Sequence, residues 1–140
     1  MNTVEKWYEV MKSNDMDELD ELLAEDVVFY SPVVFTPQKG KDITKMYLMA
    51  AGGVFGEGAK EEISKSNKNQ SNFKYIKEII GEESALLEFE SEMDGIYING
   101  VDLISWNEEG KITEFKVIVR PLQAVNMLHQ KMQTMLESMK

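Results

Sequence analysis

The chain has no cysteine among its 140 residues, which excludes disulfides, thiolate metal sites and thiol catalysis together. It has a single histidine, His129, so no pair of histidines can share a metal ion. No run of apolar residues is long enough to cross a bilayer, and the start, MNTVEKWYEV, lacks the apolar stretch of a signal peptide. We therefore expect a cytoplasmic protein without a metal.

Positive charge is also scarce, because 15 basic residues face 25 acidic ones and leave a net charge of −10. Such a chain repels phosphate backbones and anionic lipid, so neither nucleic acid nor a membrane is an expected partner. The length suits one domain over residues 1–140, in which residues 121–140 form a C-terminal helical extension.

The first 23 residues predict two amphipathic helices. Helical spacing relates Val4, Trp7, Tyr8 and Met11. In DMDELDELLAED, Asp15 is expected to cap a second helix, with Glu18 at the reciprocal position of a capping box.

The pattern then changes. VVFYSPVVF is β-branched and aromatic, and Pro32 confines it to an edge strand, a bulge or a strand end. A third helix within TPQKGKDITKMYLMAAGG is expected to end at Gly52 and Gly53. Residues 54–72 lack a clear period and predict a mobile loop that could act as a lid.

Four strand-like segments follow, at residues 73–80, 85–93, 97–106 and 112–119, and short turns join them into an antiparallel meander. The resulting fold class is α+β, with helices covering one face of a curved antiparallel sheet that forms a cone. After Pro121 an apolar seam returns at helical spacing, and it can fold back over the sheet or pair with a second copy. The seam consists of Val125, Leu128, Met132, Met135 and Met139.

Asp102 is the first candidate for chemistry. Strand alternation puts it on the same face as Ile98, Gly100, Ile104 and Trp106. Apolar surroundings raise the affinity of a carboxylate for a proton, so Asp102 could serve as an acid or hydrogen-bond donor in a cavity. It could equally accept hydrogen bonds from neighbouring groups and only organise the cavity wall.

The order of elements from residue 4 to residue 121 resembles the NTF2-like superfamily in its SnoaL-like branch. The stretches NDMDELDELLAEDVVFYSP and GVDLISWNEEGKITEFKVIVRP carry the resemblance. It implies a curved sheet wrapped around helices, an apolar cavity at the wide end and commonly a homodimer through the outer sheet face. The family includes ketosteroid isomerase, polyketide cyclases, epoxide hydrolases and members that only bind or assemble.

The resemblance to ketosteroid isomerase is incomplete. Asp102 matches the carboxylic acid that donates a hydrogen bond to the developing enolate. However, Ser31 stands where that enzyme has its general base, and Trp7, a pure donor, stands where it has a tyrosine. Gly100 occupies the position of an arginine in the epoxide-hydrolase pattern. Classical ketosteroid isomerisation is therefore not expected.

Two functions remain open. The favoured one is a non-catalytic homodimer that binds a hydrophobic small molecule. The alternative is an isomerase-, cyclase- or hydratase-type enzyme that uses Asp102 and needs no metal or organic cofactor. In either function the expected pocket lining is Trp7, Phe29, Ser31, Tyr47, Phe55, Ile104, Trp106, Phe115, Val117 and Val119.

The remaining charged residues support structural interpretations. The glutamates at 88, 90 and 92 share one strand face, which favours a solvated face over a cavity that binds cationic or hydroxyl-rich ligands. Arg120 is expected to pair with an acid at the sheet edge or across a dimer, with anion binding as the alternative. His129 is expected on the surface of the last helix.

Overall fold

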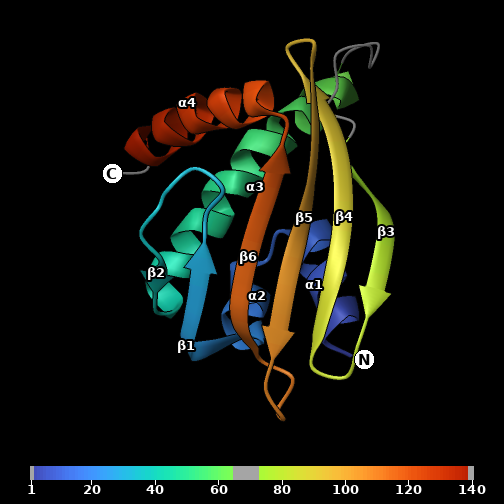
Figure 1. The fold of residues 1–140 in the computed structure, drawn as a ribbon, viewed down its shortest axis with the longest axis vertical. Coiled ribbons are helices and arrows are strands. Elements are labelled where there is room, and N and C mark those ends of the chain that lie inside the picture. Colours follow the sequence, from blue (N-terminus) through green and yellow to red (C-terminus); the bar gives the residue numbers. More distant parts are fainter. Residues whose placement is uncertain (1, 65–72, 139–140) are drawn as a thin grey trace.

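The computed structural model describes residues 2–64 and 73–138, apart from the side chains at 53 and 55–64. The helices are α1 (Thr3–Ser13), α2 (Met16–Leu22), α3 (Lys41–Ser64) and α4 (Leu122–Ser138). The strands are β1 (Leu23–Tyr30), β2 (Gln38–Lys39), β3 (Lys74–Ile80), β4 (Ser84–Met93), β5 (Ile96–Trp106) and β6 (Ile112–Arg120). Figure 1 shows α1, α2 and α3 behind one curved sheet, with α4 at its upper end. The α+β class and the helix-covered cone are thus confirmed.

The six strands form one sheet in the order β2-β1-β6-β5-β4-β3. From β3 to β6 every neighbouring pair is antiparallel, as the sequence predicts for the meander. The exception to the antiparallel expectation is β1, which pairs in parallel with β6. The strand from the N-terminal part of the chain therefore lies beside the last strand.

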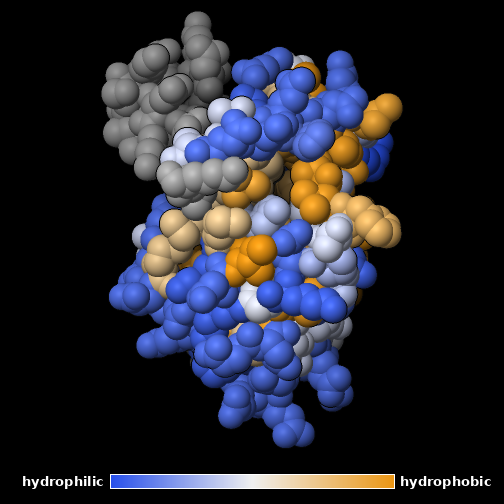
Figure 2. All heavy atoms as spheres, turned by 90° about the vertical axis from the view of Figure 1, so that its left-hand side faces the viewer, coloured by the Kyte–Doolittle hydropathy of each residue, from blue (hydrophilic) through white to orange (hydrophobic). Residues whose placement is uncertain are grey.

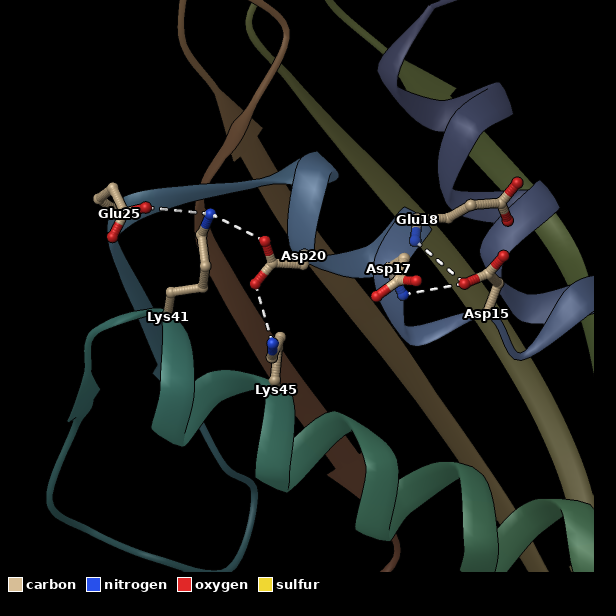
Figure 3. Close-up of polar contacts among 7 residues, drawn as sticks. All are labelled: Asp15, Asp17, Glu18, Asp20, Glu25, Lys41 and Lys45. Atoms are coloured by element: carbon tan, nitrogen blue, oxygen red, sulfur yellow. Dashed lines mark hydrogen bonds and ion pairs between the residues drawn. The ribbon is translucent and has the colours of Figure 1, made fainter.

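Side-chain caps set the boundary between α1 and α2. Asn2 and Glu5 form a complete capping box at the start of α1, and Asn14 ends the helix in the left-handed conformation, with φ of 57°. Asp15 caps α2, as predicted, by accepting from the N–H groups of residues 17 and 18 (Figure 3). The expected return bond from Glu18 is replaced by a bridge, because the Ser13 hydroxyl donates to Glu18 and accepts from the N–H of residue 15.

Ion pairs join the start of α3 to the α2–β1 corner (Figure 3). Lys45 Nζ lies 2.8 Å from Asp20 Oδ1. Lys41 Nζ lies between Asp20 Oδ2, at 3.6 Å, and Glu25 Oε2, at 3.2 Å. The hydrogen bond from Lys45 is the main cause that holds the pKa of Asp20 below its ordinary value. These contacts fix the first turns of α3 beside the α2–β1 corner.

Helix α3 is longer than the sequence predicts. It continues through Gly52 and Gly53 to Ser64, so the predicted helix end and the predicted loop over residues 54–64 are wrong. Each glycine costs a helix only about 1 kcal/mol, and packing of the residues on either side offsets it, since Ala50 and Val54 are both buried. Residues 65–72 of the expected loop lie outside the described residues.

Strand β1 runs from Leu23 to Tyr30, so Pro32 follows the strand end, which is one of the three positions predicted for it. The start of the strand differs from the prediction, because the sequence predicts Leu23 in the second helix.

Helix α4 packs against α3 and the sheet of its own chain. Its buried residues Ala124, Leu128 and Met132 belong to the apolar seam side of the helix, and the helix contacts α3, β5 and β6. Seen from the β2 side, hydrophobic residues gather along and beneath α4, whereas the opposite end of that surface is hydrophilic (Figure 2). None of the helices described is both long and apolar enough to cross a membrane.

The buried side chains form two clusters. The α1–α2 core includes Trp7, Leu19, Phe29, Ile104 and Phe115. The α3–α4 core includes Ala50, Val54, Phe89, Ile98, Leu128 and Met132. Tyr47, Tyr75 and Val117 pack against both clusters and so mark the boundary between them.

Candidate ligand-binding site

Asp102 lies at this boundary, on the inner face of β5. Its side chain is buried, with the residue only 6% exposed. Its direct cross-strand neighbours are Leu87 on β4 and Val117 on β6, and Gly100 and Ile104 lie on the same face of β5. The face of β5 that carries Asp102 and the apolar surroundings of its side chain are therefore as the sequence predicts.

A hydrogen-bonded chain reaches Asp102 from α1 through β3. Trp7 Nε1 donates to Tyr75 Oη at 3.0 Å, and Tyr75 Oη donates to Asp102 Oδ2 at 2.6 Å. Because an indole N–H can only donate, Tyr75 Oη accepts from Trp7 and keeps its own proton to donate. The acceptors in reach of that proton are Asp102 Oδ2, at 2.6 Å, and the weaker acceptor Met11 Sδ, at 3.4 Å. We call this the Trp7–Tyr75–Asp102 chain.

The electrostatics follow from burial. Desolvation raises the pKa of Asp102 to about 7, against the lowering effect of the hydrogen bond from Tyr75. Burial, followed by the charge of Asp102, raises the pKa of Tyr75 well above its ordinary value. Near neutral pH, Asp102 therefore exists in both its acid and its carboxylate form, while Tyr75 keeps its proton.

Tyr8 packs beside this chain. Its hydroxyl donates to Glu78 Oε2 on β3, and its ring centroid lies 5.6 Å from that of Tyr75. Burial is the main cause of the raised pKa of Tyr8. The bonds of Trp7 and Tyr8 thus attach α1 to β3 at two points and hold Tyr75 in place.

Tyr75 is the residue that sequence reasoning missed. It lies among Lys74, Lys77 and Glu78, so its strand has the composition of a solvated edge. The available signal was Phe73 two residues earlier, since two aromatic residues on one face of a charged strand indicate a buried face.

The expected pocket residues divide between the two cores. Trp7, Phe29, Ile104 and Phe115 are buried in the α1–α2 core, against which Trp106 packs. Tyr47 and Val117 lie at the boundary, and Val119 packs against the α3–α4 core. The side chain of Phe55 lies outside the described residues.

Ser31 and Gly100 have local structural roles. Ser31 Oγ accepts from the backbone N–H of Val33 at 3.1 Å in the turn after β1. At Gly100 a Cβ would lie 2.6 Å from Phe89 Cζ and 2.6 Å from the Ile118 carbonyl oxygen. The bare backbone of residue 100 thus accommodates the Phe89 ring, and a side chain there would displace it.

The outer face of the sheet carries the other charged candidates. Glu88 and Glu90 are half-buried there and Glu92 is exposed, in agreement with the predicted solvated face. Within the chain, Arg120 Nη1 donates to Asn99 Oδ1, an amide oxygen, at 3.2 Å. The expected pairing of Arg120 with an acid across a dimer stays a prediction. His129 is exposed on α4, as predicted.

A surface hollow lies elsewhere, between the start of α1 and the turns that follow β3 and β5. Its volume is about 320 Å³, and Lys6, Ile80, Glu82, Trp106 and Glu108 are among its lining residues. Neither Asp102 nor Tyr75 lines it, so it is separate from the buried chain. Among the residues that the structure describes, no three histidine, aspartate or glutamate side chains are grouped so that they could hold a metal ion.

Comparison with known proteins agrees with this geometry. The model of the SnoaL-like domain matches residues 4–115. A steroid delta-isomerase from Pseudomonas aeruginosa has a crystal structure that is 27% identical, with a TM-score of 0.82, over 97% of this chain and 90% of that one. No functionally curated protein matches the chain.

Two further crystal structures share the fold. An uncharacterized protein with a cystatin-like fold from Silicibacter pomeroyi is 30% identical, with a TM-score of 0.78, over 94% of this chain and 83% of that one. An NTF2-like protein of unknown function from Mesorhizobium loti is 19% identical, with a TM-score of 0.63, over 85% of this chain and 88% of that one. The chain therefore belongs to the SnoaL-like domain family.

Proposed function

We propose that this protein binds an apolar small molecule on the inner face of the sheet, where Asp102 recognises a polar group of the ligand. The observation that carries the proposal is a buried carboxyl group in an apolar wall, oriented by the Trp7–Tyr75–Asp102 chain. A buried carboxyl group costs free energy unless it is paired, hydrogen-bonded or protonated, and perturbed carboxyl groups concentrate at functional sites.

The chemistry of recognition follows from the protonation state. Tyr75 donates its only proton to Oδ2, which leaves the rest of the Asp102 carboxyl group for the ligand. As the acid, Asp102 donates to a carbonyl oxygen. As the carboxylate, it accepts from a hydroxyl or an amine. The ligand class is thus an apolar body that carries one of these groups.

Binding without turnover is the function that the geometry favours. Ser31, at the position where the resemblance implies a general base, accepts a backbone hydrogen bond and has no base beside it among its described contacts. Serine cannot abstract a carbon-bound proton by itself.

A specific observation supports a second function, a proton-transferring enzyme. The pKa of Asp102 is raised to about 7, close to the working pH at which a general acid or base is most effective. Identity of 27% to a steroid delta-isomerase structure supports the same alternative. In that function Asp102 would transfer the proton and Tyr75 would position it.

Two measurements test these functions. Native mass spectrometry of freshly purified protein should show a bound small molecule in the wild type, and Asp102→Asn should lose it while remaining folded. The exposed acid Glu108 provides the control, because Glu108→Gln removes a similar charge far from the site. The ultraviolet absorbance of a β,γ-unsaturated cyclic ketone then reports isomerisation to the conjugated product.

The outcomes separate the functions. A bound molecule without turnover supports binding alone, whereas turnover that Asp102→Asn abolishes supports the enzyme. Equal ligand occupancy of the wild type and the Asp102→Asn variant, together with equal or absent turnover, would contradict both.

We also propose that the outer sheet face forms a homodimer. Ile79 and Ile118 are 60% and 50% exposed on that face, and the half-buried Leu86, Val101 and Leu103 lie between them in register. The face also carries acids on β4 and the cations Lys116 and Arg120 on β6. A two-fold axis would place unlike charges opposite each other.

Ile118→Asp tests the dimer, because it puts a charge at one end of the apolar row on the proposed interface. Sedimentation equilibrium should report a dimer for the wild type and a monomer for the variant. Leu122→Asp is the control, since Leu122 is 72% exposed at the start of α4. A wild-type monomer would refute the proposal.

A further inference from the structure

We infer that Met11 is an oxidation site that controls Asp102, because an oxygen atom added to Met11 Sδ by a peroxide changes the direction of the hydrogen bonds in the Trp7–Tyr75–Asp102 chain. The site itself does not depend on a ligand, but its use as a control of ligand binding rests on the proposed function. In the sequence Met11 is only one apolar position of the first helix.

Met11 lies beside the hydroxyl group that orients Asp102. It follows Trp7 by four residues on α1, so the two side chains share one face of the helix, one turn apart. Both reach Tyr75 Oη, because Trp7 Nε1 donates to it at 3.0 Å and Met11 Sδ lies 3.4 Å from it as an acceptor. A thioether is a weak acceptor, so the proton of Tyr75 goes to Asp102 Oδ2, at 2.6 Å.

The side chain that carries this sulfur also reaches solvent. Met11 is 37% exposed, whereas Tyr75 is half-buried and Asp102 is buried. An oxidant dissolved in water attacks exposed thioethers first. Met11 thus presents to such an oxidant an atom that is in direct contact with the buried chain.

The reaction is the oxidation of a thioether to a sulfoxide. A lone pair of Met11 Sδ attacks one oxygen of hydrogen peroxide, so that an S–O bond forms and the O–O bond breaks. The sulfur gives up an electron pair to the peroxide, and the hydroxide that leaves takes the proton of the transferred oxygen and becomes water. A methionine sulfoxide reductase reverses the change with electrons from thiols.

The added oxygen favours the acid form of Asp102. As the carboxylate, Asp102 accepts the proton of Tyr75. As the acid, Asp102 has a proton of its own and can donate it to Tyr75 Oη, which leaves the Tyr75 proton for Met11. A thioether supports this second arrangement weakly, whereas a sulfoxide oxygen is a polar acceptor that can form an O–H···O bond of about 2.7 Å.

The neighbouring titratable groups leave this exchange intact. Tyr8 interacts with the charge of Asp102, and its hydroxyl donates to Glu78 on β3. Burial raises the pKa of Tyr8, so that it keeps its proton near neutral pH. The change at Met11 therefore acts on Asp102 through Tyr75.

The effect on binding follows from the proposed recognition. Near neutral pH the unoxidised protein holds Asp102 in both of its forms, because the pKa of Asp102 is about 7. The oxidised protein would hold mostly the acid. A hydroxyl or an amine needs the carboxylate as its acceptor, so oxidation would weaken the binding of ligands that carry those groups.

Carbon-13 NMR of the full chain with labelled aspartate tests the inference, and Asp102→Asn identifies the Asp102 signal by its loss. Hydrogen peroxide is added until peptide mass spectrometry shows one added oxygen on Met11. The pKa of Asp102 should then rise by about one pH unit, which corresponds to one net hydrogen bond. Methionine sulfoxide reductase should restore the original pKa.

Two leucine substitutions are the matched controls. Met11→Leu keeps an apolar side chain of similar size but lacks the sulfur, so peroxide should leave the pKa of Asp102 unchanged. Met49→Leu removes a methionine of α3 that is 41% exposed, and peroxide should still raise the pKa of Asp102 as in the wild type. The pair separates Met11 from the other methionines.

The possible results separate this inference from the binding proposal. An unchanged pKa in wild type oxidised at Met11 would overturn the inference, and so would an equal rise in Met11→Leu or a Met11 that stays unoxidised while Met49 reacts. Each of these results would leave the binding proposal standing, because the titration needs no ligand. If the pKa rises as expected but native mass spectrometry finds no bound molecule, the oxidation site is confirmed and the binding function fails.

Discussion

The replacement of Asp102 by asparagine should change how the stability of the protein depends on pH. Asparagine has nearly the same shape, and its side-chain oxygen can still accept the hydrogen bond from Tyr75. The variant should therefore fold, while the only group that it removes is the titrating carboxyl group. We expect the free energy of unfolding of the wild type, relative to the variant, to fall as the pH rises.

The sign and size follow from the pKa values. The pKa of Asp102 is about 7 in the folded chain, against about 4 for an unfolded chain. Between these values the folded state binds a proton that the unfolded state has lost, so stability is greatest below about pH 4 and decreases until about pH 7. From about pH 5.5 to about pH 8.5 the loss amounts to about 2 kcal/mol.

Urea unfolding followed by circular dichroism at several pH values measures this difference. The comparison is between wild type and variant, because the many surface acids affect both equally. Glu108→Gln should parallel the wild type, since Glu108 is exposed in the turn between β5 and β6. If wild type and Asp102→Asn gave parallel curves over this range, the carboxyl group would not be buried as described, and the binding proposal would lose its basis.

Three further substitutions test neighbouring features. Tyr75→Phe removes the hydrogen bond that favours the carboxylate form of Asp102, so the pKa of Asp102 should rise by about one to two pH units in carbon-13 NMR. An unchanged pKa would contradict the Trp7–Tyr75–Asp102 chain. Gly100→Ala should lower the free energy of unfolding, measured in urea, by about 1–3 kcal/mol through overpacking. Gly52→Ala is the control and should not be destabilising, because an added Cβ there meets nothing within 4 Å. Asp15→Ala should cost about 1 kcal/mol in the same assay through loss of the α2 cap, and an unchanged midpoint would refute the role of that cap.

Patterns of local origin were predictable from the sequence. The β3–β6 meander follows from strand alternation and turn residues, and the cap at Asp15 follows from the preference of short polar side chains for helix starts. The inward direction of Asp102 follows from the same alternation. These features depend on neighbours in the chain, which a single sequence displays.

The features that depend on distant packing were not predictable. Gly52 and Gly53 have the local preference of a helix end, but burial of Ala50 and Val54 against other elements keeps α3 helical. The role of Tyr75 depends on Trp7 of α1, to which no spacing pattern connects it. The contact between Met11 and Tyr75 likewise depends on the packing of α1 against β3.

The parallel pairing of β1 with β6 also has a consequence for synthesis. Leu23 pairs with Ile112 and Phe29 pairs with Phe115. The β1 edge that pairs with β6 therefore stays unpaired until β6, the last strand, has been synthesised. Non-local pairing of this kind slows folding, because a long loop must close before its contacts form. The nascent N-terminal part therefore keeps an uncovered strand edge during most of translation, which is the stage at which chaperone binding would matter most.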